Sequence, residues 1–145
     1  MLTLLVKRLT STAILPVKGS SEAACFDLHV DSFELEAQGW KVHTGLSVAL
    51  PQGYGMLIYA RSGLGTKLGL TLRNGTGVID SDYRGEILLK FHLGGPREEI
   101  LKALKPGSRI AQAMIIQIPE VTMEEVFSEL PSSVRGTGGF GSTGL

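Results

Sequence analysis

Hydrophobic and polar residues alternate along much of this chain. Between Val42 and Leu50, apolar side chains fall mostly on every second position, as on a strand that buries one face. Short apolar runs of this kind occupy residues 2–9, 26–30, 40–50, 55–59, 86–93, 109–118 and 121–127. Gly, Pro, Asn and Asp separate the runs, and no strand–helix–strand rhythm is present. The pattern therefore predicts strands at these runs and an all-β fold, an antiparallel sandwich or barrel.

Two segments interrupt the β pattern with helical features. Residues 62–67 are long enough for one helical turn. Residues 97–104 place Ile100, Leu101 and Leu104 on one helical face and lie between two prolines, which favour helix ends. The same residues 97–104 also fit a strand, so both alternatives stay open there. The sequence thus predicts at most one or two short helices.

The end of the chain has a different composition. Residues 131–145, PSSVRGTGGFGSTGL, contain too few apolar side chains to pack as core. We therefore predict one β-domain at 1–130 and a flexible, glycine-rich arm at 131–145. Phe140 gains nothing among glycines in solution, but it would gain from stacking on the ring of a ligand. This favours an active-site lid over the alternative, a plain disordered tail.

Charge and composition narrow the functional classes. The 14 basic and 14 acidic residues cancel, which argues against a general nucleic-acid binder or a membrane-surface protein. The single Cys25 excludes an internal disulfide and a thiolate zinc site. Lys7 and Arg8 interrupt the apolar start after six residues, too early for a membrane span or a signal segment. We therefore expect an intracellular, cytoplasmic protein.

The segment NGTGVIDSDYRG, residues 74–85, is the first candidate for chemistry. Asn-Gly and aspartates form turns, so a plain hairpin explains the segment. Alternatively, two carboxylates, an amide and an aromatic ring form a pocket for a small molecule. In that case Asp80 activates a water molecule and Tyr83 presents the face of its ring.

The segment ARSGLGTKLGL, residues 60–70, is the second candidate. If Ser62 begins a helical turn, its hydroxyl and the free backbone N–H groups there bind an anion, with added charge from Arg61 and Lys67. The alternative is a capped turn with solvated cations. Two polar residues in apolar surroundings, Asp27 and Gln112, lie either on exposed strand positions or against a ligand.

Five segments together resemble the five motifs of the homotrimeric dUTPases, in the same order and over nearly the whole chain. They are AACFDL at 23–28, ARSGLGTKLGL at 60–70, NGTGVIDSDYRG at 74–85, GSRIAQ at 107–112 and RGTGGFGSTG at 135–144. The resemblance implies a jelly-roll-like β fold and a homotrimer with active sites at the subunit interfaces. It implies hydrolysis of dUTP to dUMP and pyrophosphate with Mg²⁺ as cofactor, which limits uracil incorporation into DNA and supplies dUMP for dTMP synthesis. Neither nucleic acid nor a membrane is an expected direct partner.

The same resemblance assigns roles to individual residues. Asp80 would activate the water that attacks the α-phosphorus. The implied contacts to base and sugar are Asn74, Gly77, Val78, Ile79, Tyr83 and Phe140. The implied contacts to the phosphates are Arg61, Ser62, Gly63, Gln112, Arg135, Gly141, Ser142 and Thr143. The substrate phosphates would hold the magnesium ion, while Asp27 would either reach it through water or brace Arg61.

Three positions depart from the usual family pattern. Cys25 stands where glycine is usual, Ala60 where proline is usual, and Ser108 where an acidic residue is usual. None of them has a proposed catalytic role, so we expect activity. Two rival functions are a dCTP deaminase, which shares the fold class, and a catalytically silent nucleotide sensor. Asp80, Tyr83 and the arm with its phenylalanine favour the hydrolase.

Overall fold

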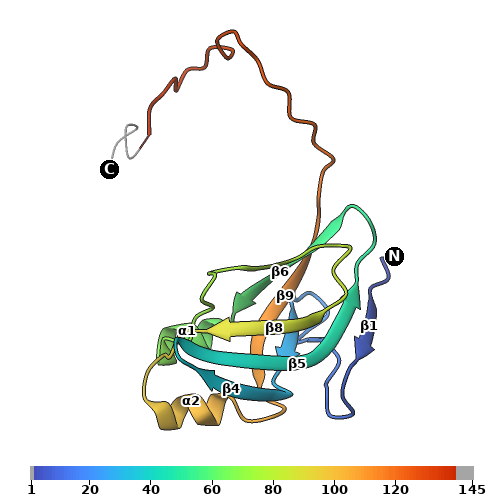
Figure 1. Cartoon of the computed structure of the whole chain (residues 1–145), viewed down its shortest axis with the longest axis vertical. Helices are drawn as coiled ribbons and strands as arrows, with labels where there is room; N and C mark the ends of the chain where they lie inside the picture. The colour runs from blue at the N-terminus through green and yellow to red at the C-terminus, as the bar shows by residue number, and fades with distance from the viewer. Residues whose placement is uncertain (1, 140–145) are drawn as a thin grey trace.

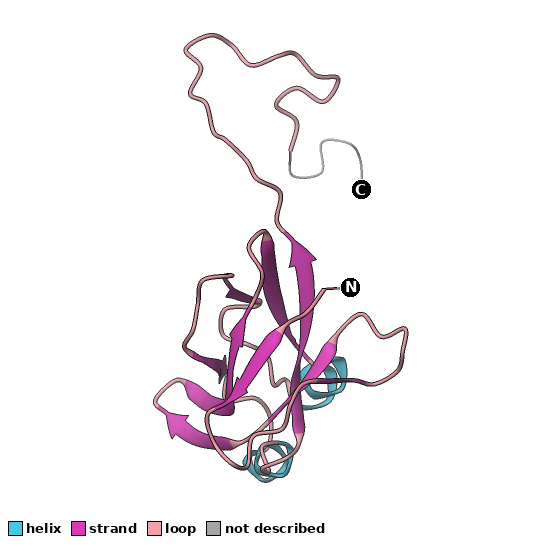
Figure 2. Cartoon of the chain, turned by 90° about the vertical axis from the view of Figure 1, so that its right-hand side faces the viewer, coloured by secondary structure: helices cyan, strands magenta, loops and turns pink. Residues whose placement is uncertain are grey.

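Two antiparallel β-sheets form the body of the protein in the computed structural model, which describes residues 2–139 (Figures 1 and 2). The first sheet is built around the long strand β5 (Gly39–Ala49). Strand β8 (Glu86–Phe91) pairs with one edge of β5, so β4 (Ser32–Glu36) and β1 (Leu5–Arg8) share the other edge. A shift of register in β5 separates the segments that pair with β4 and β1.

The second sheet has five strands and brings distant sequence segments together. Its order is β2 (Val17–Lys18), β3 (Phe26–His29), β9 (Arg109–Gln117), β6 (Tyr54–Ala60) and β7 (Gly77–Ile79). Strand β9 lies between β3 and β6, and Gln112 is therefore opposite Asp27 on one side and Tyr59 on the other. This register places the first, second and fourth sequence motifs next to one another.

The alternating pattern of the sequence corresponds to the buried faces of these strands. In β8 the side chains of Ile87, Leu89 and Phe91 are buried, whereas Leu88 and Lys90 are exposed, because successive side chains of a strand point to opposite faces. The alternate positions predicted on β5, from Val42 to Leu50, are buried as well. Side chains from both sheets form one hydrophobic core. The predicted all-β, jelly-roll-like fold with two short helices is confirmed.

Two helices of seven residues each complete the body. Within residues 2–139 no helix is long and apolar enough to span a membrane. Helix α1 (Ser62–Leu68) follows β6, and α2 (Arg97–Ala103) precedes β9. The helical alternative for residues 97–104 is therefore the right one. Ile100 and the following Leu104 are fully buried, but Leu101 is 38% exposed. Placing Leu101 on the buried face was wrong, because adjacent residues of a helix point in directions about 100° apart.

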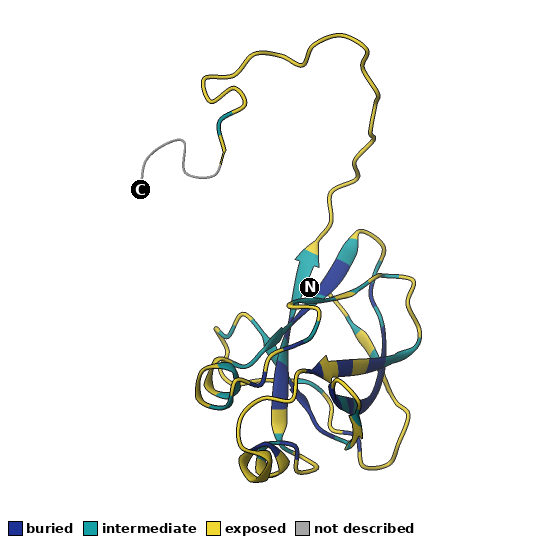
Figure 3. Ribbon diagram, turned by 60° about the vertical axis from the view of Figure 1, so that its left-hand side comes forward, coloured by how far each residue is buried: buried dark blue, intermediate teal, exposed yellow. Residues whose placement is uncertain are grey.

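The apolar run at 121–127 does not form the strand that its pattern predicts. Strand β9 ends at Gln117, and the N–H of Ile118 donates a last backbone hydrogen bond to the carbonyl of Gly53 at 2.8 Å. Residues 119–139 then run away from the two sheets, almost entirely exposed (Figure 3). Met123 is 94% exposed and Phe127 is 93% exposed. An apolar pattern alone does not make a strand, because the backbone also needs a neighbouring strand to bond with.

Candidate active site

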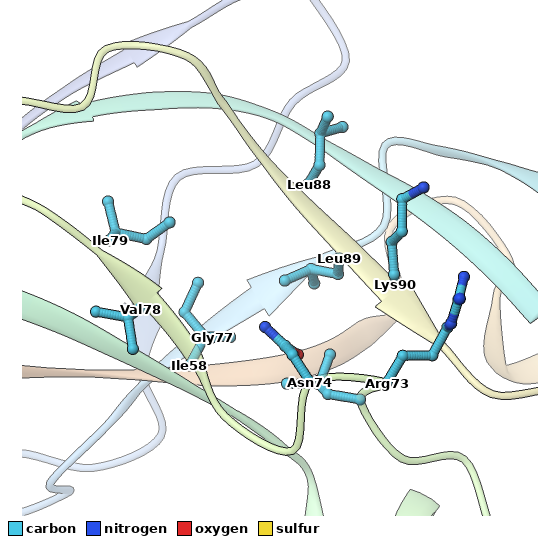
Figure 4. Close-up of a pocket in the computed structure, with 10 residues that line it drawn as sticks. Ile58, Arg73, Asn74, Gly77, Val78, Ile79, Leu88, Leu89 and Lys90 are labelled. Carbon is cyan, nitrogen blue, oxygen red and sulfur yellow. The ribbon is translucent and has the colours of Figure 1, made fainter.

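A pocket of about 440 Å³ opens between β7 and β8 (Figure 4). At one end of the pocket the two chain segments meet in an isolated antiparallel β-bridge between Leu72 and Phe91. Next to this bridge, the N–H of Arg73 donates to the carbonyl of Lys90 at 2.8 Å. Beyond this point the segments diverge, because β7 pairs with β6 instead of β8. Among the described residues, one edge of β7 thus has no strand partner, and its backbone groups are available to a ligand.

The residues that line this β7–β8 pocket combine apolar walls with polar groups. They are Ile58, Leu72, Arg73, Asn74, Gly77, Val78, Ile79, Leu88, Leu89 and Lys90. Five residues of the body were predicted to contact the base or sugar. The structure places four of them, Asn74, Gly77, Val78 and Ile79, around this pocket, and Tyr83 is not among the residues that line it. A Cβ atom on Gly77 would lie 3.2 Å from Cβ of Ile58, so glycine allows β7 to approach β6 closely. Apolar walls, a free strand edge and the Asn74 amide suit a planar ring with polar edges.

Asp80 lies on a tight turn that directly follows β7. The N–H of Tyr83 donates to the carbonyl of Asp80 at 3.2 Å, and Nη1 of Arg84 donates to the carbonyls of Ser81 and Tyr83 at 2.7 and 2.8 Å. Asp80 itself is exposed and borders two open hollows beside the β7–β8 pocket. Arg84 braces the turn, a role that the residue pattern alone did not reveal.

Tyr83 folds back over Gly85. Its hydroxyl donates a hydrogen bond to the carbonyl of Glu86 at 3.0 Å. A Cβ atom on Gly85 would lie 2.3 Å from Oη and 2.5 Å from Cζ of Tyr83. Non-bonded atoms do not approach this closely, so this position of the ring requires glycine at residue 85. The proximity follows from the fold of the turn, and motif spacing gave no sign of it.

A carboxylate between two arginines lies at the ends of β3, β6 and β9. Oδ1 of Asp27 is 3.4 Å from Nε of Arg61, and Oδ2 is 3.2 Å from Nη1 of Arg109. Nη1 of Arg61 also donates to the carbonyl of Arg109 at 3.2 Å. The contact with Arg61 is the geometry that the bracing role requires, and a contact of Asp27 with magnesium through water stays a prediction. Arg109 completes the cluster, although it was not among the predicted site residues.

The predicted phosphate contacts Arg61, Ser62, Gly63 and Gln112, which we call the anion group, lie around the start of α1. The N–H groups of Leu64 and Gly65 bond to the carbonyl of Arg61, so the N–H groups of Ser62 and Gly63 precede the helical pattern. No atom lies within 4 Å of a Cβ built on Gly63, which leaves room for a ligand. The amide of Gln112 donates to the carbonyl of Ala60 at 3.4 Å.

Cys25 and His29 border this region. Cys25 lines a pocket of about 270 Å³ together with Asp27 and Gln112. His29 is buried, and its Nδ1 has no hydrogen-bond partner within the described chain. Burial lowers the pKa of the His29 imidazole, although the Asp27 carboxylate acts in the opposite direction. The imidazole is therefore uncharged at neutral pH and adds no positive charge to the anion group.

The predicted residues of the arm are only partly within the described chain. Arg135 lies on the exposed arm, where its Nε donates to the carbonyl of Gly138 at 2.8 Å. Phe140, Gly141, Ser142 and Thr143 lie outside the described residues. The anion group and the β7–β8 pocket are both on the body, and of the anion group only Gln112 lines one of the pockets described above, the one that also contains Cys25 and Asp27.

The fold and the candidate site describe an antiparallel β protein with two distinctive features: a pocket of apolar walls beside a free strand edge, and backbone N–H groups next to Arg61 at the start of α1. Comparison with known proteins makes this specific. The family model described as dUTPase matches residues 11–144. The chain is 39% identical, over the full length of both proteins, to the deoxyuridine 5′-triphosphate nucleotidohydrolase of Dictyoglomus turgidum. The chain belongs to the dUTPase family.

Further relatives agree in sequence and in structure. The deoxyuridine 5′-triphosphate nucleotidohydrolase of Wolinella succinogenes is 43% identical over 94% of this chain and 91% of its own. Among solved structures, the dUTPase of Staphylococcus bacteriophage 80alpha with dUpNHpp has a TM-score of 0.85 and 27% identity, covering 99% of both chains. A dUTPase from phage phi11 of S. aureus, described with a structural Mg(II) ion, shares the fold at a TM-score of 0.73 and 24% identity, over 87% of this chain and 97% of its own.

Proposed function

We propose that this dUTPase-family enzyme hydrolyses dUTP to dUMP and pyrophosphate through attack of an Asp80-activated water on the α-phosphorus. The observation that carries the proposal is the position of Asp80, which directly follows the free edge of β7 and is exposed to water. Within the described chain its carboxylate takes part in no ion pair or hydrogen bond. A carboxylate without a cation partner is available to accept a proton from water. The reaction limits uracil incorporation into DNA and supplies dUMP for dTMP synthesis.

The β7–β8 pocket supports recognition of uracil. The free edge of β7 and the Asn74 amide supply donors and acceptors for the polar edge of the base, and a wrong base would leave such groups unpaired at a cost of about 1–3 kcal/mol each. The apolar walls at Ile58 and Leu89 bound the space on the other side. An extra methyl group in a pocket changes affinity by only about 1–3 kcal/mol, so we attribute rejection of thymine to steric contact. Tyr83 is proposed to lie under the deoxyribose and to exclude a ribose 2′-hydroxyl.

The anion group is proposed to hold the phosphate chain of a substrate whose base lies on a second copy. The resemblance to the homotrimeric dUTPases supports this arrangement, in which the base and the phosphates of one substrate contact different copies. The outer face of the second sheet supports such an assembly, because Val78, Leu57 and Met114 lie side by side on it and Val78 is 63% exposed. Leu57 and Met114 are half-buried, and apolar side chains that gather on an outer face are typical of a protein interface. We therefore propose a homotrimer with active sites at the subunit interfaces.

Magnesium is proposed to arrive with the substrate. No group of three or more His, Cys, Asp or Glu side chains within residues 2–139 could hold a metal ion. Both oxygens of Asp27 already face arginines, so Asp27 fits a contact through water better than direct coordination. The phosphate oxygens are then the principal ligands, as is usual for Mg²⁺. When bound, Mg²⁺ offsets the charge of the triphosphate, while Arg61 orients the same phosphates.

The arm is proposed to close over the bound nucleotide. Arg135 and the hydroxyls of Ser142 and Thr143 would contact the phosphates together with Gly141, and Phe140 would stack on the uracil ring. The exposure of residues 119–139 supports this proposal, because an arm that makes few contacts with its own body is free to cover a ligand.

The proposed function predicts pyrophosphate release from dUTP alone when dUTP, dTTP, dCTP and UTP are offered side by side with magnesium. Each of the other three nucleotides differs from dUTP at one place: dTTP has an extra methyl group on the base, dCTP has a different polar base edge, and UTP has a 2′-hydroxyl on the sugar. Enzyme-coupled detection of pyrophosphate measures the four rates. Equal rates would contradict the proposed pocket. Ammonia release from dCTP would support the deaminase, and inactivity on all four would leave the silent sensor as the better explanation.

Gly85→Ala is expected to lower kcat/KM for dUTP by about 100-fold, the usual scale of a displacement of roughly 1 Å in an active site. The new methyl group would force the Tyr83 ring from its position. Steady-state kinetics and the selectivity for dUTP over UTP measure the effect. Gly65→Ala is the matched control, because a Cβ there meets only Cγ2 of Thr71 at 3.9 Å. Unchanged kinetics of Gly85→Ala would show that the ring position is irrelevant to turnover.

A further inference from the structure

Two cations, Arg73 and Lys90, line the end of the β7–β8 pocket beside Asn74 and have no role in the proposed reaction. Arg73 immediately precedes Asn74, and Lys90 lies on β8. Figure 4 shows the Arg73 side chain extending on the side of Lys90, while the Asn74 amide turns towards Gly77. The backbones of the two cations are joined by the 2.8 Å hydrogen bond from the Arg73 N–H to the Lys90 carbonyl.

A single carboxylate from β4 contacts both cations. The two oxygens of Glu36 lie 2.9 and 3.0 Å from Nζ of Lys90, and Oε2 is 3.7 Å from Nη1 of Arg73. Nη2 of Arg73 also donates to the side-chain carbonyl of Gln38, in the turn between β4 and β5. Strand β4 is separated from β8 by β5, so these side chains cross one strand to reach the rim of the pocket.

Beyond the Arg73 N–H bond to Lys90, the backbone of the loop that carries Asn74 makes only local hydrogen bonds: the Gly75 N–H donates to the carbonyl of Leu72 at 3.0 Å, and the Thr76 N–H donates to that of Asn74 at 2.7 Å. Asn74 itself is exposed. The side chain of Arg73, in contrast, is only 27% exposed and contacts Glu36 of β4 and Gln38 of the turn that follows it.

We propose that Glu36 and Gln38 are positioning residues that hold Arg73, and through it the Asn74 loop, in the place where the amide can meet the base. The inference rests on the proposed function of the β7–β8 pocket, and it identifies the side chains that keep the Asn74 amide in position there. Three charged groups and an amide restrict one another more than an isolated surface ion pair does. The contribution is to binding of the base and not to the chemical step, because none of the four side chains lies on the Asp80 turn.

Glu36→Gln tests the proposal, and Glu34→Gln is its matched control. Glu34 lies on the same strand and pairs with Lys41 at 2.6 Å, and Lys41 does not line the pocket, whereas both cations that contact Glu36 do. For Glu36→Gln we expect KM for dUTP and Kd for dUMP to rise about 3-fold to 5-fold, the scale of a surface ion-pair network, with kcat nearly unchanged. Glu34→Gln should leave all three constants near the wild-type values. Gln38→Ala should raise Kd for dUMP in the same direction as Glu36→Gln.

The outcomes separate this inference from its alternatives. If Arg73 and Lys90 contact the anionic substrate directly, removing the Glu36 charge will lower KM and Kd instead of raising them. Either that result or an unchanged Kd for dUMP would overturn the proposal. A wild-type protein that binds dUMP but does not hydrolyse dUTP would contradict the proposed function alone, and the dUMP comparison would still decide the role of Glu36. A wild-type protein that does not bind dUMP would refute both.

Discussion

Asp80→Asn is expected to lower kcat for dUTP by about 100-fold or more, the usual contribution of a general base, while nucleotide binding stays near the wild-type value. Asparagine has nearly the same shape, and the turn is held by hydrogen bonds from the Tyr83 N–H and the Arg84 guanidinium to backbone carbonyls, none of which involves the Asp80 side chain. The amide, however, does not accept the proton of the attacking water. Pyrophosphate release measures turnover, and titration with a non-hydrolysable dUTP analogue measures binding.

Asp82→Asn is the control for this prediction. Asp82 lies on the same turn and borders one of the same hollows as Asp80, so the variant removes an equal charge from the same surface. Turnover by Asp82→Asn should remain within about 3-fold of wild type, the scale of a surface charge change. Near-normal hydrolysis by Asp80→Asn, or an equal loss in both variants, would remove Asp80 from its proposed role.

Mixing Asp80→Asn subunits with inactive Arg61→Ala subunits tests the shared site. If Asp80 and Arg61 of one site come from different copies, mixed oligomers contain sites in which both residues are intact, and activity returns. If both residues of a site come from one copy, no mixture regains activity. Sedimentation velocity on the same samples gives the size of the assembly, and a monomer at micromolar concentration would exclude the interface site.

Ending the chain after Pro131 is expected to lower kcat for dUTP by about 100-fold or more, if the arm supplies donors to the transition state. The hydrophobic core consists of residues on the body, from Leu28 to Ala113, so the shortened protein should keep its fold. Steady-state kinetics and thermal unfolding measure the two effects separately. A large loss of kcat with an unchanged Tm would support the lid.

Two single substitutions refine the test of the arm. Phe140→Ala should raise KM, because it removes the ring that is proposed to stack on uracil. Val134→Ala removes another apolar side chain from the same arm, in a fully exposed position, and should have no effect. If the shortened chain turns over dUTP as fast as the whole chain, the arm has no part in catalysis.

The residues of the candidate site were recognisable from the sequence, but their contacts were not. Asn74, Gly77, Val78 and Ile79 surround one pocket, and their contact with a base remains a prediction. Arg109 was missed because a lone arginine at the start of a strand has no distinctive pattern. Gly85 was missed as well, since only the folded turn shows that the Tyr83 ring takes the space of a Cβ atom.

The strand pattern also had a limit, which residues 121–127 show. The sequence predicted a strand at the apolar run 121–127 just as at 86–93, yet β8 is a strand and 121–127 is not. The difference is the neighbour: β8 pairs with β5, whereas the chain leaves the sheets after Ile118. Periodicity reports which face of a segment avoids water, and it carries no information on which backbone will pair with it.

The amino-acid sequence by itself determined the class of fold, the buried faces of β5 and β8, and the family, because these depend on local alternation and on contiguous motifs. Only the tertiary structure decided that Asp27 contacts Arg61 and Arg109, and that Glu36 reaches across β5 to Arg73 and Lys90. These contacts join residues far apart in the chain, and they depend on the pairing of strands. Pairing is a property of the whole folded chain, since each strand competes for every available edge and the packed core selects one register.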